Sequence, residues 1–261
     1  MAELPLLLFP SPDVASKTPG HGFGGNLNRP TAARQGQRLN PVFQQLQNSF
    51  NARSVELQQT PNGIDPEQVL VIETVGNVED FANAVKKVEG LEWMGEFALD
   101  GISPDEDFQD KNDPEKELSG RLYLIMSNQT ALTQMLSLWQ RYTENPETMN
   151  FQTGEYHGLA KFKDVFLHLK DIRRWGVEDR LAEREVFEIW QENINFDANR
   201  NVRFEAELWF RGSEDKRSES ESIVSRLIQE LGGSVISQCV IPSIAYHSVL
   251  GEIPAQTALQ I

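Results

Sequence analysis

The sequence lacks the features of a secreted, membrane-spanning or disulfide-bonded protein. Its one cysteine, Cys239, cannot form a disulfide within the chain, so nothing indicates an oxidising compartment. No apolar run approaches the roughly 18 residues of a membrane span. The run from Leu4 to Phe9 is interrupted by Pro5 and follows no basic segment, unlike a signal peptide. We therefore expect a cytoplasmic protein in which Cys239, in the apolar stretch VISQCVI, is buried.

Basic residues are also scarce. The 261 residues include 24 Lys and Arg against 39 Asp and Glu, which gives a formal net charge of −15. A chain with so little positive charge has no surface to neutralise phosphates, so the sequence argues against nucleic acid as a partner. The 39% of hydrophobic residues and five Trp are typical of a globular protein with a substantial core.

Motifs for catalysis, cofactors and metals are missing as well. The sequence has no subtilisin-type Asp, His or Ser signature and no nucleophile elbow, and the stretch HGFGG at His21 lacks the required Thr. No His or Cys pair has metal-ligand spacing, and we expect His168 on the solvated side of a helix. The acidic segment from Asp105 to Glu115 fails as a calcium loop, because Gln109 and Asp110 hold its fifth and sixth positions. We therefore predict no enzyme activity, no cofactor and no metal, and a solvated acidic loop.

Hydrophobic periodicity predicts a first ferredoxin-like unit after an N-terminal arm. Residues 11–37 are rich in Gly, Pro, Asn and Ser and predict a loose arm, and a helix is predicted at 40–57. Apolar residues from Phe162 to Ile172 recur at helical spacing, which favours a helix there and not a fourth strand. The order strand, helix, strand, strand, helix is most of a ferredoxin-like unit. These elements are predicted at 68–76, 78–88 (with Asn77 as N-cap), 91–99, 120–127 and 131–139.

The same order of elements begins again near residue 201. Alternating apolar and charged residues predict a strand at 201–210, and an apolar stripe from Ile223 to Leu231 predicts a helix that Gly232 and Gly233 end. Two further strands follow, and Pro254 suits the first turn of another helix. A fourth strand is absent from the prediction, so the strand at 201–210 would be an edge open to another strand. A short helix is predicted at 186–190.

Two sets of segments carry a resemblance to a known family. NVRFEAELWF, RLIQELGGSVISQCV and AYHSVLGEIPAQTALQI together resemble the propeptide (inhibitor) domain of subtilisin-like serine proteases. LPLLLFPSP, LEWMGEF, KELSGRLYLIMSN, FKDVFLHLKDIRRWGVEDRL and EAELWFRGSE resemble the N-terminal region of cytoplasmic bacterial subtilases that are encoded beside an AAA ATPase and are associated with plasmid stability and anti-phage defence. The resemblance covers nearly the whole chain and ends before a catalytic domain.

The resemblance and the periodicity together give an expected organisation. The fold class is α+β, with two ferredoxin-like βαββα(β) units that have antiparallel sheets, the second truncated, and with connecting helices. The expected parts are an arm and helix (1–60), a first unit (61–150), a helical connector (151–200) and a truncated propeptide-like unit (201–261). In related propeptides the sheet packs against surface helices of the protease and the tail occupies the substrate cleft. The resemblance therefore implies docking to a subtilisin-like catalytic domain, with weak inhibition.

Two functions follow as hypotheses. The first is a propeptide-like folding, inhibitory or regulatory module. The second is an adaptor or sensor that docks an AAA ATPase or a phage component, since the N-terminal region is longer than folding assistance requires. Charged and aromatic residues near the second unit are the predicted docking residues. They are Arg173, Arg174, Trp175, Arg203, Glu205, Glu207 and Trp209.

Overall fold

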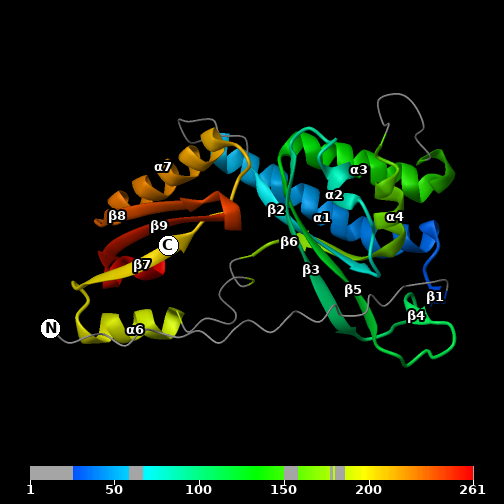
Figure 1. Cartoon of the computed structure of the whole chain (residues 1–261), viewed down its shortest axis with the longest axis horizontal. Helices are drawn as coiled ribbons and strands as arrows, with labels where there is room; N and C mark the ends of the chain where they lie inside the picture. Colours follow the sequence, from blue (N-terminus) through cyan, green and yellow to red (C-terminus); the bar gives the residue numbers. More distant parts are fainter. Residues whose placement is uncertain (1–25, 59–66, 150–157, 177–178, 180–185, 261) are drawn as a thin grey trace.

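A computed structural model shows two α+β units side by side, each built around a main antiparallel sheet (Figure 1). It describes residues 26–58, 67–149, 158–176, 179 and 186–260. The predicted fold class, α+β with antiparallel ferredoxin-like sheets, is confirmed. No helix within the described residues is long and apolar enough to cross a membrane. Residues 11–25 of the predicted arm, together with His21 and His157, lie outside the described residues.

The first unit has a complete ferredoxin-like sheet with the strand order β3-β5-β2-β6. The fourth strand corrects the prediction of one helix from Phe162 to Ile172, because α4 ends at His168 and the chain then continues as β6. Ile172 pairs with Ile72 of β2, so the apolar residues at helical spacing serve two elements in turn. The strands are β2 (Gln68–Val75), β3 (Leu91–Ile102), β5 (Leu118–Ser127) and β6 (Leu169–Arg174).

Helices cover one face of this sheet (Figure 1). The first begins at Ala32, so residues 32–37 are helical and do not belong to a loose arm. The side chain of Asn128 caps α3 by accepting a hydrogen bond from the Ala131 N–H at 2.8 Å. The second helix is shorter than predicted, and its N-cap is Asp80 instead of Asn77. The helices are α1 (Ala32–Gln58), α2 (Phe81–Val85), α3 (Gln129–Glu144), the 3-10 turn η1 (Pro146–Met149) and α4 (Lys161–His168).

Aromatic side chains fill the space between these helices and the sheet. The Phe166 side chain of α4 is buried at the centre of this cluster. Its ring lies 5.2 Å from that of Trp139 in an edge-to-face arrangement, and the Trp139 ring stacks on Phe43 at 4.5 Å. The core thus ties α1, α3 and α4 together. Further rings around Phe166 belong to Phe43, Tyr142 and Phe162.

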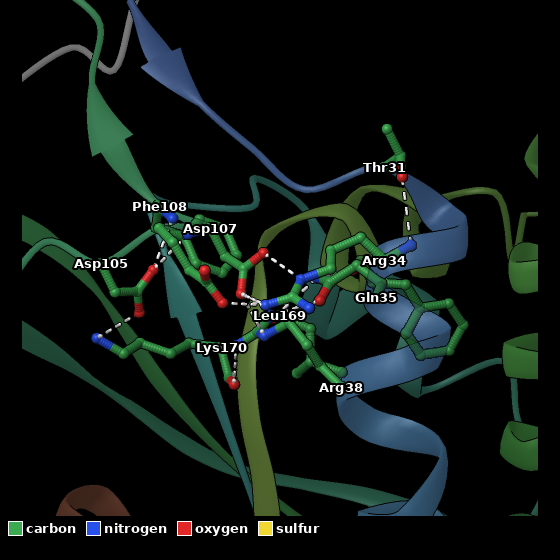
Figure 2. A network of polar contacts seen from close by, with 11 residues as sticks. Thr31, Arg34, Gln35, Arg38, Asp105, Asp107, Phe108, Leu169 and Lys170 are labelled. Atoms are coloured by element: carbon green, nitrogen blue, oxygen red, sulfur yellow. Dashed lines mark hydrogen bonds and ion pairs between the residues drawn. The ribbon is translucent and has the colours of Figure 1, made fainter.

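The acidic loop between β3 and β5 is fixed to α1 by charge. Figure 2 shows Arg34 and Arg38 converging on Asp107, with Arg34 Nε 2.8 Å from Oδ1 and Arg38 Nε 3.0 Å from Oδ2. The Asp105 carboxylate accepts hydrogen bonds from the N–H groups of Asp107 and Phe108, and the Phe108 ring is fully buried. The prediction of a simply solvated loop is therefore wrong. Its two-residue strand β4 (Gln109–Asp110) also pairs with β1 (Leu27–Asn28).

His168 is half-buried at the end of α4, not on a solvated helix face as predicted. Its Nδ1–H donates to the Val75 carbonyl at 2.6 Å, and its Nε2 accepts from the Arg29 guanidinium at 2.8 Å. Burial lowers the pKa of His168, and the nearby Arg29 charge lowers it further, although the Val75 carbonyl and Asp164 act in the opposite direction. The fold therefore holds the neutral imidazole.

Because of His168, the free energy of unfolding is expected to decrease as the pH is lowered. The folded-state pKa is below the unfolded value of about 6.5, so the contribution is complete above that pH. It is lost as the pH falls toward the folded-state pKa, since the unfolded chain takes up the proton first. His168→Asn retains an N–H donor for the Val75 carbonyl and should show a smaller loss between pH 7 and 5. Urea unfolding of both proteins at several pH values measures this, and parallel pH curves would contradict it.

The second unit is a three-stranded sheet with the order β7-β9-β8. Within the described residues β7 pairs only with β9, so it is an edge strand as predicted. Gly233 is required at the turn before β8, because a Cβ atom there would lie 2.1 Å from the Glu252 carbonyl oxygen. Pro254 ends β9, and the helix predicted after it is 3-10. The elements are α6 (Val186–Phe196), β7 (Asn201–Glu207), α7 (Glu214–Glu230), β8 (Ser234–Ile241), η2 (Pro242–Ile244), β9 (Tyr246–Pro254) and η3 (Ala255–Gln260).

Candidate functional site

The two faces of the second sheet differ in how they are covered. Apolar residues on one face, including Val249 and Ile253, form a small core with Ile228 of α7 and Trp190 of α6. Residues directly opposite each other in antiparallel strands point to the same face, so the register identifies the other face. We call this other side the open face. It carries Arg203, Glu205 and Glu207 of β7, Ser237, Cys239 and Ile241 of β8, and Tyr246, Ser248, Leu250 and Glu252 of β9.

Three of the predicted docking residues therefore lie together on the open face. Arg203, Glu205 and Glu207 alternate with half-buried residues along β7, and each is exposed. Their alternation with apolar residues was the signal that placed them on one side of a strand. The structure brings these three residues onto a surface shared with β8 and β9.

Glu205 is the centre of the polar contacts on the open face. It accepts a hydrogen bond from the Tyr246 hydroxyl, and this bond, with a weaker contribution from Ser248, lowers the pKa of Glu205. The same bond raises the pKa of Tyr246. Arg203 Nε lies 3.9 Å from a Glu252 carboxylate oxygen, a loose ion pair. The open face thus presents several carboxylates near a tyrosine.

Cys239 is exposed on the open face, which corrects the prediction that it is buried. It lies opposite Ser248, on the side of β8 away from α7, and β8 is an edge strand. The alternation in VISQCVI does not reveal this, because both faces of the strand carry apolar residues. Burial of this stretch would have required a second covering layer.

The other aromatic docking residues lie between the two units. Trp175 follows β6 and Trp209 follows β7, and their rings meet edge to face at 5.8 Å. Both are half-buried against the outer face of the first sheet, where they contact a cluster that includes Val71 and Leu124. Trp175 therefore makes a contact within the chain, and its docking of a partner stays a prediction.

The two arginines before Trp175 have separate roles. Arg173 forms a two-pronged ion pair with Asp179, at 2.6 and 2.8 Å, and this pair lowers the pKa of Asp179. Arg174 is exposed at the end of β6, where its backbone is opposite Leu70. Neither residue lies near the open face, so the predicted docking residues divide into two groups.

Arg211 is the main residue of this interface that sequence reasoning missed. Its side chain is 7% exposed, and it reaches two carboxylates of the first unit. Nη1 donates to Glu67 at 2.7 Å and Nε donates to Glu92 at 2.9 Å, while Nη2 approaches Glu92 at 2.8 Å without hydrogen-bond geometry. Lys216 of α7 contacts both carboxylates too. A single Arg after a strand gives no sequence signal of partners more than a hundred residues away.

The remaining candidates do not form a metal site in the described residues. No group of three or more His, Cys, Asp or Glu side chains there could hold a metal ion. His247 is buried beneath α7, with Nε2 3.0 Å from Glu221. No protein family model, curated protein or solved structure matches the chain. Its function must therefore be argued from the open face and the interface between the units.

Proposed function

We propose that this chain is a non-catalytic module that regulates a subtilisin-like serine protease, and that the open face contacts the catalytic domain. The observation that carries the proposal is the one-sided covering of the second sheet. α6 and α7 supply the core on one face, while the opposite face is charged and has a half-buried centre formed by Tyr246 and Leu250. A polar rim around a less polar centre is the usual anatomy of a protein interface.

The charges of the open face suit the surface helices of a protease. Glu205, Glu207 and Glu252 lie on this side of the sheet, and carboxylates are stabilised next to helix N-termini. The resemblance to subtilisin propeptides implies contact between this sheet and helices of the catalytic domain. Tyr246 holds Glu205 in place by its hydrogen bond, which reduces the entropy lost when the carboxylate binds.

The alternative, an adaptor for an AAA ATPase or a phage component, has less support. It was predicted to act through the first unit, the acidic loop and the turn that contains Arg173, Arg174 and Trp175. The Trp175 ring packs on Trp209 and on the first sheet, and Arg173 is paired with Asp179. Arg174 is exposed, and of these three side chains it is the one left without a described ring contact or ion pair.

A charge reversal on the open face tests the protease proposal. Glu205→Lys is expected to weaken binding to a subtilisin-like catalytic domain at least tenfold, about 1.4 kcal/mol, because it places a positive charge against helix N-termini. Glu230→Lys makes the same change on exposed α7, away from the open face, and should leave the affinity within twofold. Biolayer interferometry with the immobilised catalytic domain measures both. Absence of binding by the unaltered chain at micromolar concentration would reject the proposal.

A further inference from the structure

β8 is the second edge of the three-stranded sheet, and its one protection is a bulge near its start. Within the described residues it pairs with β9 on one side only. Edge strands are normally guarded by charged side chains or proline within the strand, because their free N–H and C=O groups attract other strands. β8 contains neither, and its one irregularity is a bulge between Val235 and Ser237, near the turn from α7.

Apolar side chains continue from this edge onto α7. Val240 lies opposite His247, which faces α7, so Val240 lies on the α7 side of β8, and Ile236 lies at the bulge of the same strand. Ile223 and Leu227 are one turn apart on α7. We call these four residues the edge strip. Their exposed fractions are 39% for Ile223, 37% for Leu227, 42% for Ile236 and 37% for Val240.

The charge distribution leaves β8 as a place where a second copy of this chain can approach. The chain has a net charge of −15, so two copies repel each other over most of their surfaces. The segment from Leu231 to Gly251 contains no Asp, Glu, Lys or Arg, and it is the longest such segment in the sequence. β8 lies within it, so two copies can approach along β8 at little electrostatic cost.

The strip is also complementary to itself. If two β8 strands pair antiparallel about Gln238, Ile236 of each copy lies opposite Val240 of the other. If two α7 helices cross antiparallel about Ser225, Ile223 of each copy lies opposite Leu227 of the other. The structure places these two centres together, with the Gln238 amide 3.5 Å from the Ser225 hydroxyl. One two-fold axis can therefore relate both the two β8 strands and the two α7 helices.

We propose that this chain forms a homodimer in which two β8 edges pair antiparallel about Gln238. The two sheets become one continuous sheet, and the edge strips cover each other. In Figure 1 β8 lies beside α7 at the margin of the second unit. The dimer uses the strand edge and the α7 side, so it leaves the open face accessible. Whether the dimer forms therefore does not depend on the proposed contact with the protease.

The oligomeric state of the full chain tests this proposal. Analytical ultracentrifugation of the unaltered protein is expected to give twice the 29.6 kDa mass of one chain at micromolar concentration. Val240→Lys adds an edge charge and should raise the dimer dissociation constant at least a hundredfold. Phe97→Lys is the matched control, because Phe97 is 56% exposed on an edge strand of the first sheet, and it should remain dimeric. A monomeric unaltered protein, or a dimeric Val240→Lys variant that retains its circular dichroism, would overturn the proposal.

A cross-linking experiment keeps the proposal testable even if Val240→Lys fails to fold. Gln238→Cys in a Cys239→Ser background places two thiols opposite each other across the axis, within the separation that a disulfide spans. Mild oxidation should convert most of this variant to a covalent dimer. Ser218→Cys in the same background, exposed elsewhere on α7, should stay uncross-linked. No cross-link at position 238, or equal cross-linking of both variants, would reject pairing about Gln238.

Discussion

Arg211→Ala is expected to release the second unit from the first. Breaking a buried ion pair by removing one partner costs roughly 3–5 kcal/mol when both charges are buried. Glu67 and Glu92 are 28% and 24% exposed, and Lys216 remains beside them, so we expect about 2–3 kcal/mol here. The loss should fall on the contact between the units, because Arg211 touches both carboxylates of the first unit.

Hydrogen exchange measured by mass spectrometry distinguishes release from general unfolding. In Arg211→Ala, exchange should increase around Glu92 and at residues 208–216, while the helical core around Phe43 stays protected. Arg203→Ala is the control, because that side chain is 75% exposed in a loose ion pair, and its effect should be below about 0.5 kcal/mol. If the two variants have the same stability, the Arg211 cluster does not hold the units together.

The same cluster gives the contact between the units a pH dependence. Burial is the largest single influence and would raise the pKa of Glu67 and of Glu92. Arg211 and Lys216 together, with the Gly212 N–H at Glu92, outweigh it, and both pKa values are lowered. Their contribution is complete above the unfolded value of about 4.3 and is lost as the pH falls through the folded-state pKa values. Arg211→Ala should weaken this acid dependence, since the carboxylates then keep Lys216 as their remaining positive partner.

The regular elements could be predicted because their patterns are local. β7 shows charged and apolar residues in strict alternation, and α7 carries an apolar stripe that ends at Gly232 and Gly233. In each of these two elements one face is covered by the rest of the unit and the other is exposed. Apolar residues therefore recur with the period of the strand or helix, and the sequence shows that period. The residues of the open face were found for the same reason, since Arg203, Glu205 and Glu207 are the exposed half of an alternation.

The features that were missed depend on distant parts of the chain. β6 is short, follows α4 without a break, and acquires its strand conformation by pairing with β2, about a hundred residues earlier. Its apolar residues, Leu169 and Ile172, are three apart and fit a helix equally well. The contacts of Arg211 and the exposure of Cys239 likewise depend on which surfaces of the folded chain meet. No local sequence pattern indicates this.

Phe166→Ala is expected to have the largest effect on stability, a loss of about 3–5 kcal/mol, because it removes a fully buried ring and leaves a cavity. Rings of Phe43, Trp139, Tyr142 and Phe162 surround the position, so the cavity cannot close without moving several helices. Phe97→Ala is the matched control: its ring is 56% exposed, and the loss should stay below about 1 kcal/mol. Urea unfolding followed by tryptophan fluorescence measures both variants, and equal losses would contradict the placement of Phe166 in the core.

The consequences of Phe166→Ala should also reach the interface between the units. The Gln35 amide donates to the carbonyl oxygens of Phe166 and Leu169, at 2.8 and 2.9 Å, and so fixes the junction at which α4 becomes β6. Trp175 follows directly from β6, and its N–H donates to the Val69 carbonyl. A cavity at Phe166 loosens this junction, and faster hydrogen exchange is therefore expected along β6 and at Trp175. Protection that is unchanged there would show that β6 is held by its pairing with β2 alone.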